Sequence, residues 1–412
     1  MADQHHMEMS AGALAMFERL LRRMHLSGAD ELGAAVAEEA RVIGAEGVVL
    51  YVVDYEQTTL VPVPAPDAAG RDPLPIQGTL AGRAFMMTSI VRAEGEGGPG
   101  RRLWLPLLDG TERIGVMEMA LGHDPADQDE ALCERYAHLA ALLIVSKSAY
   151  SDFFERLRRI RPMTGASELL WTVTPPTVLA GDAFVLSAVL EPAYDMGGDA
   201  FDYALNGDTL HFAVFDAMGH GLAAAGVAAF AVSIYRNSRR SHLGLADTYA
   251  AIDAAIAEQY PTSRFVTAVL AELDVGTGRL RWISAGHPAP LLLRDTRHIK
   301  TMEVAPAPPA GMRLATRPPT EAHESLEPGD MVLLYTDGLT EARRPGGELF
   351  TVERLGEFIE REAASGQAAP ETLRRLREAI IGREEGSLRD DATALLVEWS
   401  RAGAQALMPQ TV

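Results

Sequence analysis

The stretch GGDAFDYALNGDTLHFAVFDAMGHG, residues 197–221, decides the fold of the larger part of the chain. Its apolar run at residues 209–216 predicts a β-strand, and Asn206-Gly207 just before it is a hairpin-turn signal. The strand ends on Asp216, while Asp199 follows two glycines. A strand end holds a carboxylate rigidly, and glycine lets the backbone come close to whatever that carboxylate binds. The stretch therefore predicts a β-rich domain with acidic residues at the ends of its strands.

The pattern continues on both sides of this stretch. Further strands are expected at residues 184–191, 265–274, 279–286, 331–337 and 392–399, and helices at residues 220–237, 246–259, 352–362 and 371–382. The Pro-rich segment 305–319 is expected to be a loop or flap, because proline cannot lie in a central strand. Residues 166–400 are thus predicted to form one β-rich domain, followed by a frayed tail at residues 401–412.

The N-terminal part, residues 12–125, has the pattern of a small α/β domain. Leu14, Phe17, Leu21 and Met24 recur at helical spacing. Strand-like runs follow at residues 47–54, 58–63, 102–108 and 113–121, with the hairpin signal Asp109-Gly110 between the last two.

Residues 126–165 are predicted to form a helical connector. Apolar residues from Leu132 to Ile160 step by four and three positions, which is a heptad seam, and Pro162 ends it. One interpretation is that this face packs on the preceding domain. The other is a parallel coiled coil that joins two copies of the chain into a homodimer and carries a signal between domains.

Composition narrows the classes of function. With 412 residues, 47% of them hydrophobic and 23% charged, the chain is of globular type. Its formal net charge of −20 argues against nucleic acid and anionic membranes as primary partners. A single cysteine, Cys133, excludes an internal disulfide. The first residues do not resemble a signal peptide, and the longest nearly apolar stretch, residues 221–235, is too short to span a membrane. A cytoplasmic location is expected.

Four acidic motifs share one arrangement, an aspartate beside an apolar run and small turn residues. They are GGDAFD (197–202), VFDAMGHG (214–221), YTDGLTE (335–341) and RDDAT (389–393). If these carboxylates meet, they repel one another unless a cation binds. Oxygen ligands without Cys or a His pair favour hard divalent ions such as magnesium or manganese. Two such ions about 4 Å apart can activate a water and hold phosphoryl oxygens for in-line attack.

Together with FVTAVLAELD (265–274) and ISAGHPAPLLLR (283–294), these motifs resemble, in the same order, the SpoIIE/RsbU branch of the metal-dependent serine/threonine protein phosphatases. The resemblance implies two antiparallel sheets packed as a sandwich with helices on both outer faces. It also implies two divalent cations, manganese or magnesium, held by catalytic aspartates. The ligands implied are Asp199, Asp216, the carbonyl of Ala217, Asp337 and Asp390, with Asp391 as the alternative to Asp390. The implied partner is a phosphorylated STAS-domain anti-anti-sigma factor.

The N-terminal region resembles a GAF domain in its pattern of helices and strands. That resemblance implies a sensor with a small-molecule ligand, which the sequence does not identify. The expected fold class is therefore a multi-domain α+β protein, with a GAF-like sensor, a helical connector and a β-sandwich phosphatase domain. Two other functions stay open: a non-catalytic sensor that only binds a partner, and an enzyme acting on a small phosphoester.

Several other side chains are of types that catalysis or metal binding can use. His220 is a candidate general acid or a helix cap, and His287 is predicted to be a turn residue. Arg264 could face substrate phosphate, and Asp202 could support the metal site. Cys133 is expected to be a packing residue. A diguanylate-cyclase interpretation of GGD fails, because Ala200 and Phe201 stand where that family has two acidic residues.

Overall fold

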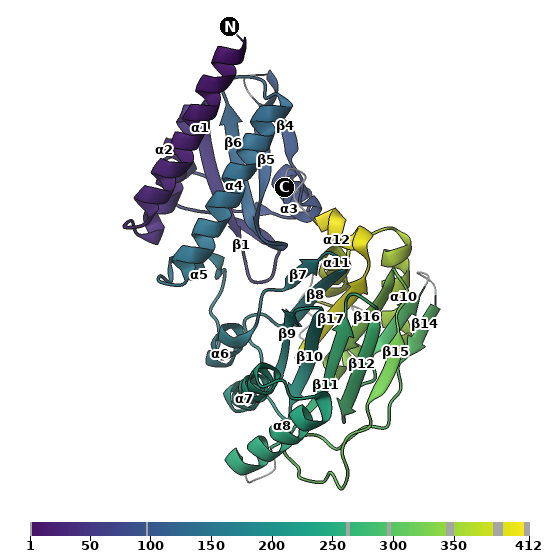
Figure 1. Ribbon diagram of the computed structural model, residues 1–412. Helices are drawn as coiled ribbons and strands as arrows, with labels where there is room; N and C mark the ends of the chain where they lie inside the picture. The colour runs from purple at the N-terminus through teal and green to yellow at the C-terminus, as the bar shows by residue number, and fades with distance from the viewer. Residues whose placement is uncertain are drawn as a thin grey trace. The chain divides into compact units, whose positions relative to one another are not determined.

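The computed structural model describes residues 2–95, 98–260, 264–294, 298–342, 350–381 and 390–407. The polypeptide divides into two compact units, one built on the residues up to Arg161 and the other running from Pro162 to Ala406. Each unit combines antiparallel sheet with helices (Figure 1). Within the described ranges, the helices lack the length and apolarity that a membrane-crossing segment requires.

The N-terminal unit contains one six-stranded antiparallel sheet in the order β3-β2-β1-β6-β5-β4. Its strands are β1 (Ala45–Val53), β2 (Thr59–Pro62), β3 (Leu74–Pro75), β4 (Val91–Gly95), β5 (Gly98–Asp109) and β6 (Glu112–Leu121). Its helices are α1 (Ala2–Met24), η1 (Ala29–Glu31), α2 (Leu32–Ala40), η2 (Arg41–Ile43), η3 (Pro66–Ala68), α3 (Leu80–Met87), α4 (Asp127–Ser148) and α5 (Phe153–Arg158).

Successive side chains of β1 point to opposite faces of this sheet and belong to two apolar cores, one on each face. Leu50 belongs to the cluster that holds residues of α1, α2 and α4, whereas its neighbour Tyr51 packs with residues of α3. Successive side chains of a strand point to opposite faces, so a continuous apolar run is what a sheet covered on both faces needs. The strands expected from the sequence in this unit are confirmed.

The single long helix expected at residues 126–165 is instead divided. Helix α4 ends at Ser148 and α5 begins at Phe153, where the amide of Phe153 donates to Ser151 Oγ at 3.2 Å. Tyr136 from the heptad seam is buried against the sheet of its own unit, and its hydroxyl donates to Val36 O at 2.8 Å. Of the two interpretations of the seam, the described contacts correspond to packing on the preceding domain. Cys133 is buried there too, as a packing residue.

The C-terminal unit contains two antiparallel sheets. The five-stranded sheet runs β15-β12-β11-β10-β9, and the six-stranded sheet runs β14-β13-β16-β17-β8-β7. The first is made of β9 (Asp199–Asn206), β10 (Thr209–Ala217), β11 (Val266–Asp274), β12 (Arg279–Ala285) and β15 (Ala322–Ser325). The second is made of β7 (Val178–Gly181), β8 (Phe184–Glu191), β13 (Leu291–Arg294), β14 (His298–Thr301), β16 (Asp330–Tyr335) and β17 (Ala392–Trp399).

The two sheets share one apolar core and carry helices on their outer faces. Phe212 and Val214 of β10 join Leu395 and Val397 of β17 in one buried cluster. Helix α7 contacts β9 and β10, while α11 contacts β8 and β17 (Figure 1). The expected sandwich is therefore present. The helices of this unit are α6 (Gly165–Val173), α7 (Gly221–Arg240), α8 (Leu245–Gln259), α9 (Asp337–Glu341), α10 (Val352–Ala364) and α11 (Ala369–Ile381).

Three details differ from expectation or add to it. Strand β9 begins at Asp199 itself, so the two glycines of the GGDAFD motif precede the strand and its last four residues belong to it. Residues 305–319 form a loop joined to β11 and β12 by isolated bridges at Ala310 and Ala307, as their prolines predict. The tail starts as a helix, α12 (Arg401–Leu407), and residues 408–412 lie outside the described residues.

Candidate functional site

The hairpin of β9 and β10 brings the first two predicted aspartates together. The strands pair in register, so Asp199 at the start of β9 stands directly opposite Asp216 near the end of β10. The turn at Asn206-Gly207, where Gly207 has φ of 59°, fixes that register from the far end. Asp199 is buried and Asp216 is half-buried. Directly opposed like charges destabilise a sheet, and a bound cation or a proton on one carboxylate relieves the repulsion.

Asp391 organises the GGD segment through the backbone. Its Oδ2 accepts hydrogen bonds from the amides of Gly197 at 2.6 Å, Gly198 at 2.6 Å and Asp199 at 3.1 Å. Three N–H donors on one oxygen stabilise the ionised carboxylate. Position 198 has no room for a side chain, because a Cβ there would lie 2.4 Å from the carbonyl oxygen of Ala217. The carbonyl that the sequence predicts to be a ligand is thus packed against the GGD turn.

Thr336 links the two sheets at this end of the sandwich. Its hydroxyl donates to Asp199 Oδ2 at 2.6 Å and accepts from the amide of Thr393 at 2.9 Å. Asp337 follows as the first residue of α9 and is exposed. Gly338 lies against the backbone of Asp391, where a Cβ would come within 1.8 Å of its carbonyl oxygen. All four acidic motifs therefore converge at one edge of the sandwich.

Burial and neighbouring negative charges raise the pKa values of the clustered carboxyl groups. Burial, followed by the charges of Asp337, Asp390 and Asp391, raises the pKa of Asp216 to about 7. Burial, then Asp391 and Asp216, raises the pKa of Asp199 well above its usual range. Burial also raises the pKa of Asp391, although its three N–H donors act in the opposite direction. Mutual repulsion of this kind marks functional carboxylate clusters and disappears when a cation binds.

The donor set fits hard divalent cations. It consists of carboxylate oxygens and one backbone carbonyl, which are the ligands that magnesium and manganese prefer. Among the described residues, no three acidic, His or Cys side chains already stand as a finished cage for one ion. The carboxylates are nevertheless close enough to raise one another's pKa values.

Two other candidate residues, Asp202 and His220, form no hydrogen bond with the carboxylate cluster among the residues that the structure describes. Asp202 is fully buried, and its carboxylate accepts from Arg236 Nε at 2.9 Å and Arg239 Nη1 at 2.8 Å. Asp202 therefore fastens β9 to α7, and its oxygens are occupied by guanidinium groups. His220 occupies the N-cap position of α7, where its side chain makes no capping hydrogen bond, and it is exposed.

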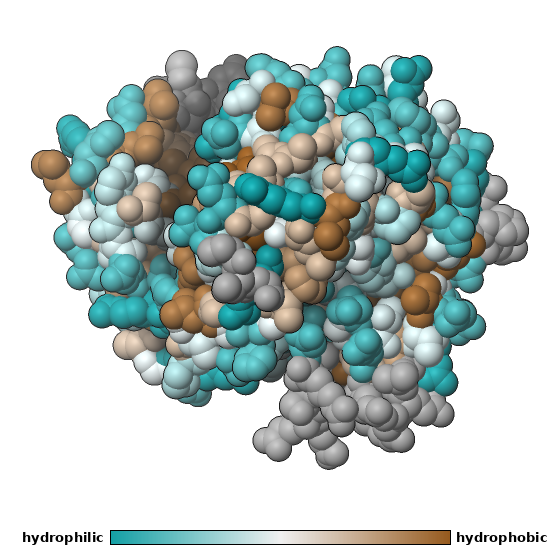
Figure 2. Space-filling view, turned by 90° about the horizontal axis from the view of Figure 1, so that it is seen from below, coloured by the Kyte–Doolittle hydropathy of each residue, from teal (hydrophilic) through white to brown (hydrophobic). Residues whose placement is uncertain are grey.

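Arg264 lies beside the loop after β10. Its Nη1 donates to Met218 O at 3.2 Å and would lie 3.3 Å from a Cβ at position 219. Met218 and the nearby Leu222 are exposed, at 45% and 63%. The surface seen from below in Figure 2 carries such exposed hydrophobic residues among hydrophilic ones.

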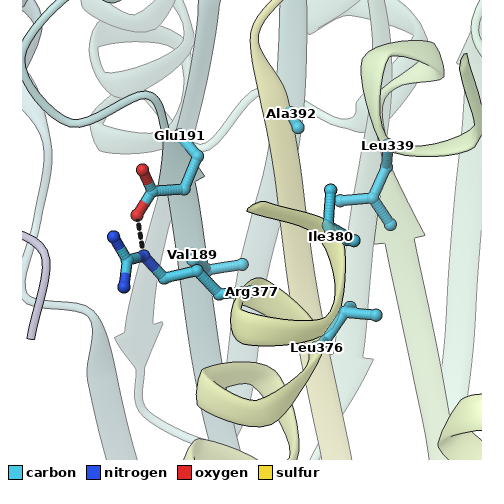
Figure 3. Close-up of a pocket in the computed structure, with 7 residues that line it drawn as sticks. All are labelled: Val189, Glu191, Leu339, Leu376, Arg377, Ile380 and Ala392. Carbon is cyan, nitrogen blue, oxygen red and sulfur yellow. Dashed lines mark hydrogen bonds and ion pairs between the residues drawn. The ribbon is translucent and has the colours of Figure 1, made fainter. Parts of the chain in front are cut away.

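A small apolar pocket lies behind the RDDAT segment. Its lining comes from β8, α9, α11 and β17, and Figure 3 shows Leu339, Leu376, Ile380 and Ala392 around it. Glu191 of β8 forms an ion pair with Arg377 of α11 at its edge (Figure 3). Because Glu191 pairs with Ala392 in register, this contact supports the strand that follows Asp391.

Sequence reasoning missed Thr336 and the role of Asp391 as a hydrogen-bond acceptor. The two consecutive glycines at 197 and 198 did indicate that some group comes close to the backbone there. In the structure that group is the carboxylate of Asp391, which accepts hydrogen bonds from both glycine amides.

Comparison with known families bears on this region. Residues 206–400 match the family model described as stage II sporulation protein E, SpoIIE. Over these residues the chain is similar to that family. The matched region contains Asp216, Asp337, Asp390 and Asp391, and it begins after Asp199.

Curated proteins are similar to this chain over about half of its length. Protein IcfG of Synechocystis sp. is 27% identical over 245 residues, which are 52% of this chain and 37% of that protein. Phosphoserine phosphatase RsbU of Bacillus subtilis is 22% identical over 236 residues, covering 56% of this chain and 68% of RsbU. The chain thus spans little more than a third of IcfG and about two thirds of RsbU.

Solved structures are similar over little more than half of the chain. One contains the RsbU and RsbW domains of a Mycobacterium tuberculosis protein, with 28% identity, a TM-score of 0.45, and coverage of 55% of this chain and 62% of that one. Another is the SiaA-PP2C domain of Pseudomonas aeruginosa, with 19% identity, a TM-score of 0.47, and coverage of 57% and 94%.

Proposed function

We propose that this protein is a metal-dependent serine/threonine protein phosphatase. The observation that carries the proposal is the meeting of aspartates from four separate segments, which raises the pKa of Asp216 to about 7 through burial and the charges of Asp337, Asp390 and Asp391. Such a cluster is costly without cations and useful with them. The curated relatives RsbU and RsbP of Bacillus subtilis, both named phosphoserine phosphatases, support the same activity.

The proposed ligands are Asp199, Asp216, the carbonyl of Ala217, Asp337 and Asp390. Asp390 is preferred to Asp391 because one oxygen of Asp391 already accepts three backbone amides. Asp390 is exposed, and its Oδ1 accepts a hydrogen bond from the amide of Asp391 at 3.0 Å. Two bound divalent ions, manganese or magnesium, would supply charge neutralisation for a phosphate and an activated water.

The chain's own groups would prepare this chemistry. Thr336 and the backbone around Gly198 hold Asp199 in place, so the carboxylate needs little reorganisation. Arg264, which donates to Met218 O in the loop after β10, would bind a phosphoryl oxygen, and guanidinium suits that task because it donates two parallel hydrogen bonds. The exposed Met218 and Leu222 beside it would contact apolar residues of a protein substrate.

The finer assignments belong to the same proposal. The substrate would be a phosphorylated STAS-domain anti-anti-sigma factor, and the N-terminal unit would act as a GAF-like sensor for a small molecule in a cytoplasmic homodimer. The sheet of the N-terminal unit, with apolar clusters on both of its faces, supports a sensor with a buried interior. The resemblance of the motifs to the SpoIIE/RsbU branch supports the substrate.

Hydrolysis assays on the full chain test the proposal. With manganese, we expect release of phosphate from a phosphoserine STAS protein, and loss of release in EDTA. Asp216→Asn should lower kcat at least about a hundredfold, because a ligand to the cations is lost. Asp208→Asn is the matched control, since Asp208 is exposed at the opposite end of the same hairpin.

The alternatives predict different results. Turnover of free phosphoserine but not of the phosphoprotein would indicate a small-molecule enzyme. An absence of turnover in the full chain, and equally after removal of the N-terminal unit, would indicate a non-catalytic binding module.

A further inference from the structure

His287 is a buried residue that touches both sheets of the sandwich. It follows β12 of the five-stranded sheet, is 7% exposed, and its amide and carbonyl both contact Ser284 Oγ. Its Nδ1 lies 2.7 Å from Thr267 Oγ1 on β11, and its Nε2 lies 3.0 Å from the carbonyl oxygen of Tyr335 on β16. The sequence predicted only a turn residue here, so this bridge is new.

The hydrogen-bond partners of His287 determine which of its ring nitrogens carries the proton. A carbonyl oxygen only accepts, so Nε2 carries the hydrogen and donates to Tyr335. Burial lowers the pKa of His287 to about 4, which leaves the ring neutral near pH 7 and Nδ1 as an acceptor. The hydroxyl of Thr267 therefore donates to Nδ1.

Each partner of His287 adjoins a proposed ligand. Thr267 stands directly opposite Asp216 in the β10–β11 ladder, and Tyr335 lies two residues before Asp337. Asp216 belongs to the five-stranded sheet, whereas Asp337 follows a strand of the six-stranded sheet. His287 thus ties the two sheets together at the edge where the carboxylates meet.

We propose that His287 is a positioning residue for the cation site. Through Thr267 and the Tyr335 carbonyl it sets the spacing between Asp216 and Asp337. This inference rests on the proposed function. Mutation of a residue that orients a metal ligand through a hydrogen bond typically lowers metal affinity by about ten- to a hundredfold.

Calorimetric titration of the chelator-treated full chain with manganese chloride tests the inference. Thr267→Val removes the hydroxyl at nearly constant volume, and His287→Gln removes the ring that reaches both partners. We expect both variants to bind manganese about tenfold more weakly than the wild type. Thr267→Ser, which keeps the hydroxyl, should stay within about twofold of the wild type. His323→Gln, at an exposed histidine on β15, should have no effect.

The outcomes separate positioning from packing. Wild-type manganese affinity in Thr267→Val and His287→Gln, with only a lower melting temperature, would overturn the inference and leave the proposed function intact. If His287→Gln fails to fold, Thr267→Val decides. Absence of manganese binding by the wild type would overturn both proposals. Nitrogen NMR of the metal-free protein should show the Nε2–H tautomer of His287, and the Nδ1–H tautomer would contradict the inferred hydrogen bonds.

Discussion

Replacing Asp216 by Asn should stabilise the metal-free protein above neutral pH while removing its activity. The pKa of Asp216 is raised to about 7 in the folded state, by burial and then by Asp337, Asp390 and Asp391. In the unfolded chain an aspartate titrates near about 3.9. The folded state therefore binds the proton more tightly, and the stability of the wild type falls as pH rises between those two values.

The size of the effect follows from the shift. About three pKa units correspond to about 4 kcal/mol at full ionisation, an upper value because the neighbouring carboxylates share the same repulsion. The advantage of Asp216→Asn should be near zero below pH 4, grow through pH 5 and 6, and level off above pH 7. Manganese should reverse the order, since it stabilises only the protein that binds it.

Urea unfolding in EDTA at several pH values measures this difference. Tryptophan fluorescence suits the assay because Trp171, Trp282 and Trp399 lie in the C-terminal unit. Asp208→Asn again serves as control. A stability difference between Asp216→Asn and the wild type that stays flat from pH 4 to pH 8 would refute the reasoning that the carboxylates repel one another.

Three further predictions concern the same edge of the sandwich. Gly198→Ala should prevent manganese binding seen by calorimetry, because its Cβ would lie 2.4 Å from Ala217 O, whereas Gly165→Ala, where an added Cβ meets nothing within 4 Å, should bind normally. Thr336→Val should lower the free energy of unfolding by about 1–3 kcal/mol in urea melts, because two buried hydrogen bonds are lost; an unchanged value would contradict this. Arg264→Ala should raise KM for a phosphoprotein more than it lowers manganese affinity; equal effects on both would argue against phosphate binding.

Much of the fold could be predicted from local pattern. Strands β8, β10 and β17 begin and end within one residue of the expected bounds, because apolar runs closed by turn residues and by an aspartate define them. The connector shows the limit. A heptad seam predicted one helix, but α4 ends at Ser148 and α5 begins at Phe153, and Tyr150 at the break is 89% exposed. A heptad pattern shows which residues are apolar and does not fix where the helix ends.

The site was predictable in its residue types and only partly in its connections. Aspartates at strand ends indicated a carboxylate cluster, and their pKa shifts agree with such a cluster. The sequence could not show that Asp391 would hold the amides of Gly197 and Gly198, since those residues lie nearly two hundred positions away. The same holds for Thr336 and His287, whose partners belong to the opposite sheet and depend on how the sheets pack.

A crystal structure of the full chain soaked in manganese, with anomalous scattering recorded, tests the central claim most directly. The account predicts two anomalous peaks among the oxygens of Asp199, Asp216, Ala217, Asp337 and Asp390. Peaks located elsewhere, or none at saturating manganese, would contradict it.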